Sequence, residues 1–170
     1  MLATYGGPAS AVVDVGAGVS QLPDELLGAG WTDVTVLDVS PEAVATVQTR
    51  LAGRVGLSFV VADVLTWRPD RLYDVWHDRA VLHFLVDPES QQRYADTSAA
   101  ALQAGGIAVL GVFAPDGPTQ CSGLPTCQYD ATTLSALCGS NFSLVHHERE
   151  EHRTPTGALQ PFTWAVLRRL

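Results

Sequence analysis

Short apolar runs and longer mixed segments alternate along the chain, which predicts repeated strand–helix units. The apolar runs that have the length of buried strands cover residues 11–15, 33–37, 57–61, 73–76 and 107–113. Helices are expected over residues 20–27, 41–51, 88–102 and 130–138. This alternation is typical of a parallel sheet with helices on both faces, so we expect an α/β fold.

Turn and cap residues set several of these boundaries. Ser40 is followed by proline, and serine at the N-cap with proline at the first helical position is a strong helix start. Ser20 is the expected cap of the first helix. Gly105 and Gly106 are expected to break the helix that begins at Pro88.

The last two predicted strands, residues 142–150 and 161–168, have no helix between them. A parallel crossover needs a dozen or more residues, and the linker near residues 153–157 is too short for one. We therefore expect the final strand to run antiparallel to its neighbours. No second domain is visible, and a single domain over residues 1–170 is expected.

Composition narrows the possible partners. The chain has 170 residues, 46% of them hydrophobic, and a formal net charge of −8. A nucleic-acid backbone is therefore not an expected partner. A membrane is not expected either, because no apolar stretch approaches the roughly 18 residues of a membrane span. An odd number of cysteines suits a reducing cytoplasm better than a disulfide framework, so we expect a cytoplasmic protein. A monomer or a homodimer is expected.

Glycines and carboxylates gather where the first three predicted strands end. Gly16 and Gly18 follow the first run, Asp38 ends the second and Asp63 ends the third. In an open α/β sheet, ligands bind outside the carboxyl ends of the strands. The spacing therefore predicts that these residues lie on one rim, around one nucleoside-like ligand.

Five motifs along the chain form a recognisable set: Asp14-x-Gly16-x-Gly18, Asp38, Ala62-Asp63, Asp74–Arg79 and the Leu102–Gly106 turn. With these motifs, the chain resembles the class I S-adenosylmethionine-dependent methyltransferases from residue 12 to residue 167. In the Leu102–Gly106 turn, Ala104 stands where the family has proline. The resemblance implies a Rossmann-like, doubly wound sheet of seven strands, mostly parallel, in the order 3-2-1-4-5-7-6 with an antiparallel C-terminal strand.

The resemblance also implies S-adenosyl-L-methionine as cofactor and S-adenosyl-L-homocysteine as product. Asp38 would accept the ribose hydroxyls, and Asp63 would recognise the adenine amino group. The residues expected to bind the cofactor are Asp14, Gly16, Ala17, Gly18, Asp38, Val39, Ser40, Ala62, Asp63, Val64 and Asp78. The catalytic candidates are His77, Asp78, Arg79 and His83, which follow the fourth predicted strand. His83 lies in an apolar run, where it fits a core histidine as well as a catalytic base.

The methyl acceptor is left open. The segment from Trp76 to Leu85 resembles that of a subgroup of small bacterial methyltransferases, which fixes no substrate. A small thiol, a metalloid oxyanion or another small nucleophile would fit. Cys121 and Cys127 share a loop, and soft thiolates bind metalloids, although loop and packing roles explain these cysteines as well. No metal site is expected, because the histidines and glutamates of residues 146–152 fit a solvated strand face better.

Two other hypotheses are kept. A NAD-dependent dehydrogenase carries the fingerprint G-x-G-x-x-G, but Gln21 stands at the place of its third glycine. The other hypothesis is a non-catalytic module that binds S-adenosylmethionine and needs a partner or a missing N-terminal segment. Its basis is that the first strand begins near residue 11, so the lid helices that family members usually carry before it are expected to be lacking.

Overall fold

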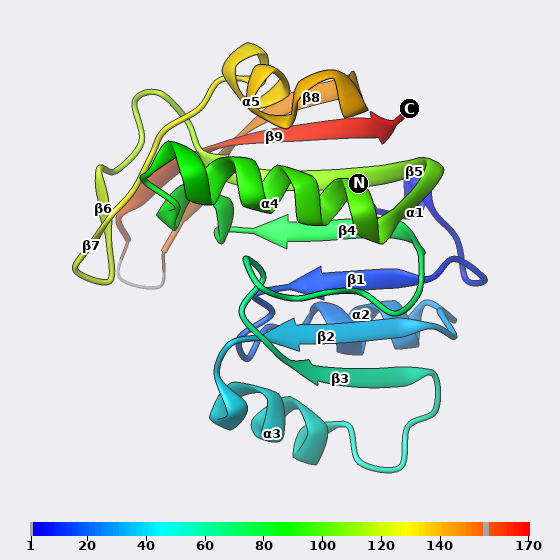
Figure 1. Ribbon diagram of the computed structural model, residues 1–170. Helices are drawn as coiled ribbons and strands as arrows, with labels where there is room; N and C mark the ends of the chain where they lie inside the picture. The colour runs from blue at the N-terminus through cyan, green and yellow to red at the C-terminus, as the bar shows by residue number, and fades with distance from the viewer. Residues whose placement is uncertain (1, 155–156) are drawn as a thin grey trace.

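Seven strands form one sheet in the computed structural model, which describes residues 2–154 and 157–170 (Figure 1). They are β1 (Val12–Val15), β2 (Val34–Asp38), β3 (Leu57–Val61), β4 (Tyr73–Arg79), β5 (Leu102–Phe113), β8 (Phe142–Arg153) and β9 (Leu159–Arg169). Their spatial order is β3-β2-β1-β4-β5-β9-β8. The first five strands pair in parallel, whereas β9 runs antiparallel to both β5 and β8. The predicted topology is confirmed.

Helices pack on both faces of this sheet. They are α1 (Leu2–Tyr5), α2 (Leu22–Gly28), α3 (Pro41–Arg50), α4 (Pro88–Ala101) and α5 (Ala131–Cys138), with short 3-10 turns at Leu82–Phe84 and Gly139–Asn141. Helices α4 and α5 lie in front of the sheet in Figure 1, and α2 lies behind it. Within the part of the chain that the structure describes, no helix is long and apolar enough to cross a membrane.

The two faces carry separate hydrophobic clusters, because successive residues of a strand point to opposite sides. Trp76 of β4 belongs to the cluster under α4, together with Tyr94. Its neighbour Val75 belongs to the cluster under α2, together with Trp31. The central strands are therefore buried on both sides, as in other parallel sheets.

Three predicted boundaries are wrong. Strand β4 continues to Arg79 instead of ending at Trp76, because its residues pair with both β1 and β5. Strand β5 begins at Leu102 instead of Ile107, directly after α4 ends at Ala101, so Gly105 and Gly106 lie within the strand and do not end the helix. Helix α2 begins at Leu22 with Gln21 as its N-cap, and the Ser20 hydroxyl lies 3.4 Å from an Asp14 oxygen instead of capping the helix.

The long loop after β5 holds a small hairpin that sequence patterns did not predict. Its two strands are β6 (Gln120–Cys121) and β7 (Leu124–Pro125), which pair antiparallel. The loop then returns to the body of the protein, where the Cys127 amide donates to the His83 carbonyl at 2.8 Å. The hairpin thus projects at the same end of the sheet as the C-terminal ends of the parallel strands (Figure 1).

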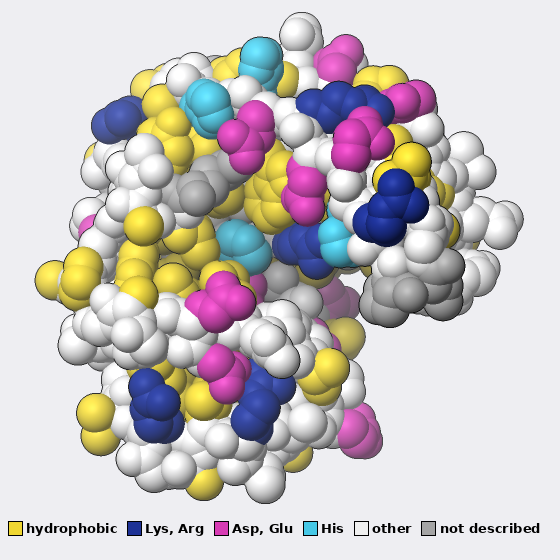
Figure 2. Space-filling view, turned by 180° about the vertical axis from the view of Figure 1, so that it is seen from behind, with side chains coloured by type: hydrophobic (Ala, Val, Ile, Leu, Met, Phe, Trp, Pro, Cys, Tyr) yellow, Lys and Arg dark blue, Asp and Glu magenta, His cyan; other side chains and the backbone are white. Residues whose placement is uncertain are grey.

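The face behind the sheet is only partly covered by helices. Figure 2 shows hydrophobic side chains in a hollow on this face, with histidine, arginine and carboxylate side chains close by. A cavity of about 420 Å³ lies there, between α1 and α2 on one side and the β8–β9 hairpin on the other. Trp31, Val109 and Trp164 supply its apolar walls.

Candidate active site

A tight glycine turn follows β1. Gly16 and Gly18 have φ angles of 60° and 55°, in the left-handed region that favours glycine. A Cβ atom at Gly16 would lie only 2.0 Å from a methyl group of Val81, so the turn packs directly on the segment after β4. A Cβ atom at Gly18 would meet nothing within 4 Å, so that side of the turn is open.

Asp38, at the end of β2, holds this turn in place. Its carboxylate accepts hydrogen bonds from the Gly18 amide at 2.7 Å and from the Ser40 amide at 2.8 Å. Ser40 in turn caps α3 by accepting from the Ala43 amide at 3.1 Å, as predicted. The Asp38 side chain therefore joins the glycine turn to the start of α3.

An apolar pocket of about 430 Å³ opens beside Asp38. The ends of four neighbouring strands and the segment after β4 line it: Val15, Gly16, Leu37, Asp38, Val39, Ala62, Asp63, Val64, Leu65, Ala80, Val81, Phe84 and Leu85. Asp63 is exposed at its edge and accepts from the Leu65 amide at 2.9 Å. The predicted rim of strand-end carboxylates is thus assembled around one pocket.

A polar pocket of about 410 Å³ lies on the other side of Gly16. Its lining is Asp14, Val15, Gly16, Ala17, Ser20, Gln21, Leu22, Glu25, His77 and Arg79. Both pockets include Val15 and Gly16 in their lining, so they adjoin at the glycine turn, and the two together are called the cleft below.

Asp14 and His77 form a buried pair in the floor of the polar pocket. Nδ1 of His77 lies 2.8 Å from an Asp14 oxygen, and the two residues are adjacent across the β1–β4 pairing. His77 is 8% exposed, and its ring stacks on Trp164 at a centroid distance of 6.1 Å. The carboxylate leaves Nε2 as the ring nitrogen that is available to a ligand.

Arg79 is exposed at the end of β4 and faces the same pocket. Its guanidinium carbon lies 5.2 Å from the centre of the Phe162 ring, a cation–π distance. Among the described residues, no carboxylate pairs with it. The pocket therefore offers an unpaired cation together with the acidic side chains of Asp14 and Glu25.

Comparison with known proteins decides the family. Residues 12–106 match the family model described as "Methyltransferase domain". The chain belongs to the class I S-adenosylmethionine-dependent methyltransferases. This assignment removes the dehydrogenase hypothesis. None of the curated proteins matches the sequence.

Solved structures of methyltransferases share the fold. A methyltransferase from Methanosarcina mazei is 18% identical with a TM-score of 0.82, and the alignment covers 99% of this chain and 96% of that one. The N-methyltransferase NodS from Bradyrhizobium japonicum is 20% identical with a TM-score of 0.80 and coverages of 99% and 89%. The 1,6-didemethyltoxoflavin N1-methyltransferase from Burkholderia thailandensis is 24% identical with a TM-score of 0.78 and coverages of 99% and 74%.

Asp78 of this methyltransferase lies away from the cleft. It has no exposed surface, and its carboxylate accepts hydrogen bonds from the amides of Val81 at 2.8 Å and Leu82 at 3.0 Å and from the Tyr94 hydroxyl. Burial raises the pKa of Asp78 to about 6, although these hydrogen bonds oppose the shift. Asp78 lines neither of the two pockets, so its predicted contact with the cofactor stays a prediction.

His83 is also fully buried in the methyltransferase. Its ring stacks on Phe113 at 4.3 Å and meets the edge of Phe84 at 4.6 Å. In the described chain, neither ring nitrogen has a hydrogen-bond partner. Burial lowers the pKa of His83 to about 4, so the ring is neutral at physiological pH. Its surroundings are those of a core histidine.

The cysteines and histidines form no metal site in the described chain. Cys121, Cys127 and Cys138 are free thiols, and Cys138 is buried, which raises its pKa to about 12. No group of three or more His, Cys, Asp or Glu side chains within residues 2–154 and 157–170 could hold a metal ion. The charged residues of β8 are largely exposed, as expected for a solvated face.

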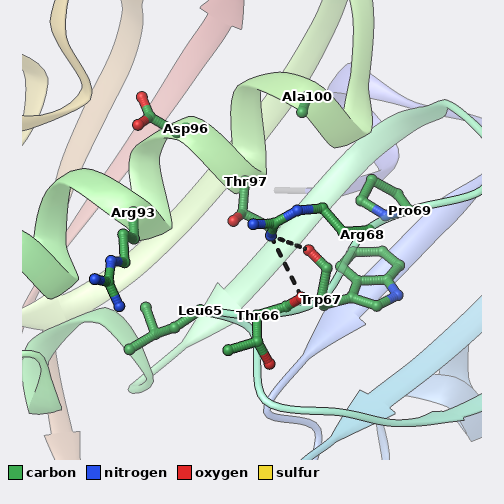
Figure 3. A pocket seen from close by; sticks show the side chains of 9 residues that line it. All are labelled: Leu65, Thr66, Trp67, Arg68, Pro69, Arg93, Asp96, Thr97 and Ala100. Atoms are coloured by element: carbon green, nitrogen blue, oxygen red, sulfur yellow. Dashed lines mark hydrogen bonds between the residues drawn. The ribbon is translucent and has the colours of Figure 1, made fainter.

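A separate groove of about 360 Å³ lies between residues 65–69 and α4 (Figure 3). Arg68 donates there to the carbonyls of Thr66 at 3.3 Å and Trp67 at 3.0 Å. Trp67 packs near Trp76 and Tyr73 at centroid distances of 6.3 and 6.1 Å. The groove shares Leu65 with the apolar pocket of the cleft, and its charged side chains bond within the protein or lie on its rim.

Sequence motifs missed most of the apolar lining and one buried tyrosine. Leu37, Leu65, Phe84 and Leu85 line the apolar pocket, and Tyr94 bonds Asp78 from α4. A signal was available for Leu37 and Leu65, because these two residues lie at or close to predicted strand ends. Tyr94 has no such signal, because its partner lies 16 positions earlier in the chain.

Proposed function

We propose that this methyltransferase transfers a methyl group from S-adenosylmethionine to a small-molecule nucleophile, with both parts of the cofactor held in the cleft around Gly16. The observation that carries the proposal is the contrast between the two pockets that meet there. One is walled by apolar side chains with carboxylates at its edge, and the other carries charges of both signs. The two ends of S-adenosylmethionine show the same contrast, because the adenosine is mainly apolar and the amino-acid group carries charges of both signs.

The apolar pocket suits adenosine. Each Asp38 oxygen accepts one backbone hydrogen bond and keeps capacity for another, so the carboxylate can accept ribose hydroxyls. Val39, Ala62 and Val64 would flank the base, with Asp63 at its polar edge. Ser40 would act through its amide, which already orients Asp38.

The polar pocket suits the amino-acid end of the cofactor. Arg79, which has no carboxylate partner in the described chain, would pair with the carboxylate group. Asp14 and Glu25 supply the negative charge that an ammonium group requires. Ala17 and Gly18 would approach the ligand through their backbone, because the turn is open on the Gly18 side.

The bound sulfonium supplies an electrophilic methyl group, and the protein's part is to align it with the acceptor. Alignment of two reactants can lower a barrier by roughly 7–11 kcal/mol. His77 is the residue suited to take a proton from the acceptor, because Asp14 holds Nδ1 and leaves Nε2 available. Asp14 would then be a positioning residue for His77.

The acceptor is proposed to be small. The Burkholderia enzyme named above was crystallised with its small substrate 1,6-didemethyltoxoflavin and S-adenosylhomocysteine. Small thiols, amines and metalloid oxyanions are therefore the first acceptors to test.

The proposal is tested in two stages with the full chain. Calorimetry with S-adenosylmethionine, S-adenosylhomocysteine and adenosine should show saturable binding, tightest for the first two because they fill both pockets. Radiolabelled methyl transfer to a panel of thiols, amines and metalloid oxyanions then seeks the acceptor. Binding without transfer to any acceptor, also after addition of a cell extract, would favour the non-catalytic module. No binding of either cofactor form would overturn the proposal.

A further inference from the structure

The segment just after β4 forms the wall between the two pockets. Ala80 and Val81 line the apolar pocket, while Arg79 lines the polar one. Ala80 has a φ of 74°, which an L-residue rarely adopts. Such a conformation persists only when the surrounding structure enforces it. Something in the fold must therefore hold this segment against the glycine turn.

The group that holds this segment in place is the carboxylate of Asp78. Its two oxygens accept the amides of Val81 at 2.8 Å and Leu82 at 3.0 Å, so one carboxylate closes the turn around Ala80. Hydrogen bonds to an ionised group are stronger than those between neutral groups. The resulting turn presses a Val81 methyl group onto Gly16.

A second layer supports the carboxylate from α4. The Tyr94 hydroxyl donates to Asp78, and the Trp76 indole donates to the same hydroxyl at 2.9 Å. Trp76, Asp78 and Tyr94 are all fully buried. This chain of hydrogen bonds therefore links the middle of α4 to the junction of the two pockets.

We propose that the buried Trp76–Tyr94–Asp78 chain is a positioning device that fixes the Ala80–Leu82 turn against Gly16 and thereby sets the geometry at the junction of the cleft. The inference rests on the proposed function, because the junction is where the adenosine and amino-acid parts of the cofactor would meet. Asp78 acts through the turn and touches no ligand.

Protonation of Asp78 gives the device a property that a passive core lacks. In a protonated carboxyl the hydroxyl oxygen is a poor acceptor, so only one oxygen remains to hold the Val81 and Leu82 amides. The Ala80–Leu82 turn should therefore loosen as Asp78 is protonated. Burial raises the pKa of Asp78 to about 6, whereas the Tyr94 hydrogen bond lowers it. Two other groups act on Asp78 electrostatically. They are His77, on the opposite face of the same strand, whose charge also lowers this pKa, and Cys138 of α5, whose own pKa is raised to about 12.

The decisive variant is Tyr94→Phe in the full chain. Loss of the hydroxyl donor should raise the pKa of Asp78, so the acid midpoint of S-adenosylhomocysteine affinity should move up by about one pH unit. Binding at pH 8, where Asp78 stays ionised, should remain within about twofold of wild type. Tyr129→Phe is the matched control, because Tyr129 is a buried tyrosine of the same cluster without a bond to Asp78. Its acid midpoint should not move.

Two further measurements keep the test independent of binding. Asp78→Asn should abolish the acid limb, because an amide does not titrate in this range. Amide hydrogen exchange at Val81 and Leu82 should be faster in Tyr94→Phe than in Tyr129→Phe, with or without ligand. Equal midpoints and equal exchange in all variants would overturn the positioning device while leaving the proposed function intact. Failure of the wild-type chain to bind either cofactor form would instead overturn the proposed function.

Discussion

The two pockets that meet at Gly16 are alike in size and unlike in chemistry. The apolar pocket is formed by strand ends and by Val64, Phe84 and Leu85, so its shape depends on packing against the cores of the protein. The polar pocket is formed by side chains such as Glu25 and Arg79, which project from the edge of the cleft. One region would select a ligand by fit, the other by charge.

This difference has a consequence for how each region responds to change. A pocket made by packed strand ends tolerates the loss of a surface charge and is sensitive to any shift of its backbone. A pocket that relies on exposed charges responds to salt and to substitution of single side chains. The glycine turn belongs to both regions, so it is the place where one change should affect them together.

The largest effect is expected from Gly16→Ala. Its Cβ atom would lie 2.0 Å from Val81, and its φ of 60° is unfavourable for alanine. We expect S-adenosylhomocysteine affinity to fall by about a hundredfold. Gly53→Ala, with a φ of 81° and open space around its Cβ, controls for backbone strain alone. Combining Gly16→Ala with Val81→Ala should recover part of the loss in calorimetry. Equal affinities for the Gly16 and Gly53 variants would contradict the packing argument.

Asp38→Ala should weaken the apolar side of the cleft. Loss of charge-assisted bonds to two ribose hydroxyls should lower S-adenosylmethionine affinity at least tenfold, since each is worth roughly 1.5–3 kcal/mol. The matched control is Asp33→Ala, because Asp33 is also at an end of β2, directly before its first residue, but its carboxylate pairs with Arg71 outside the cleft. Circular dichroism should show both variants folded. If affinity is unchanged in Asp38→Ala, Asp38 does not belong to the site.

Arg79→Gln should weaken binding in the polar pocket and leave binding in the apolar pocket unchanged. S-adenosylhomocysteine affinity should fall roughly tenfold through loss of a charged hydrogen-bond donor, while the affinity for adenosine, which lacks the amino-acid end, should stay the same. The salt dependence of S-adenosylhomocysteine binding should also become weaker. A parallel loss for adenosine would place Arg79 in the wrong region of the cleft.

His83→Phe is expected to change the cleft least and the pH dependence of stability most. Burial lowers the pKa of His83 from 6.5 to about 4. Between these values the unfolded chain binds a proton that the folded chain does not, so the free energy of unfolding contributed by His83 falls as pH drops. Asp78 has the opposite slope, because its folded-state pKa is raised to about 6.

Urea unfolding at pH 7 and pH 5 checks this prediction. His83→Phe should gain about 2 kcal/mol over the wild type on going from pH 7 to pH 5. Its S-adenosylhomocysteine affinity at pH 7.5 should equal that of the wild type. Abolished methyl transfer in a stable variant would instead support the catalytic base predicted from the sequence.

Local patterns predicted the frame of the cleft. The glycine turn, Asp38 and Ser40 carry short-range signals, because each acts on groups close to the end of its own strand or on the neighbouring turn. The order of the strands followed from the alternation and from the short linker before β9. These features depend on backbone geometry, which residue type and spacing report directly.

The partners of the buried polar residues His77 and Asp78 could not be predicted in the same way. Because His77 and Asp78 are polar, the sequence pattern predicted that β4 ends just before them. Both residues lie within the strand and are buried. Their partners are Asp14, 63 positions earlier, and Tyr94, 16 positions later. A buried polar residue is stable only with such partners, and no periodicity shows where they come from.

The two edge strands of the sheet differ in how readily they would pair with a strand of another chain. Strand β8 presents histidine, glutamate and arginine side chains along most of its length, and charges on an edge discourage pairing with another chain. Strand β3, at the opposite edge, is the five-residue sequence LSFVV and carries no charge. Its Val61 is 52% exposed. At high concentration or during partial unfolding, self-association through β3 is therefore the route by which this protein would be expected to aggregate.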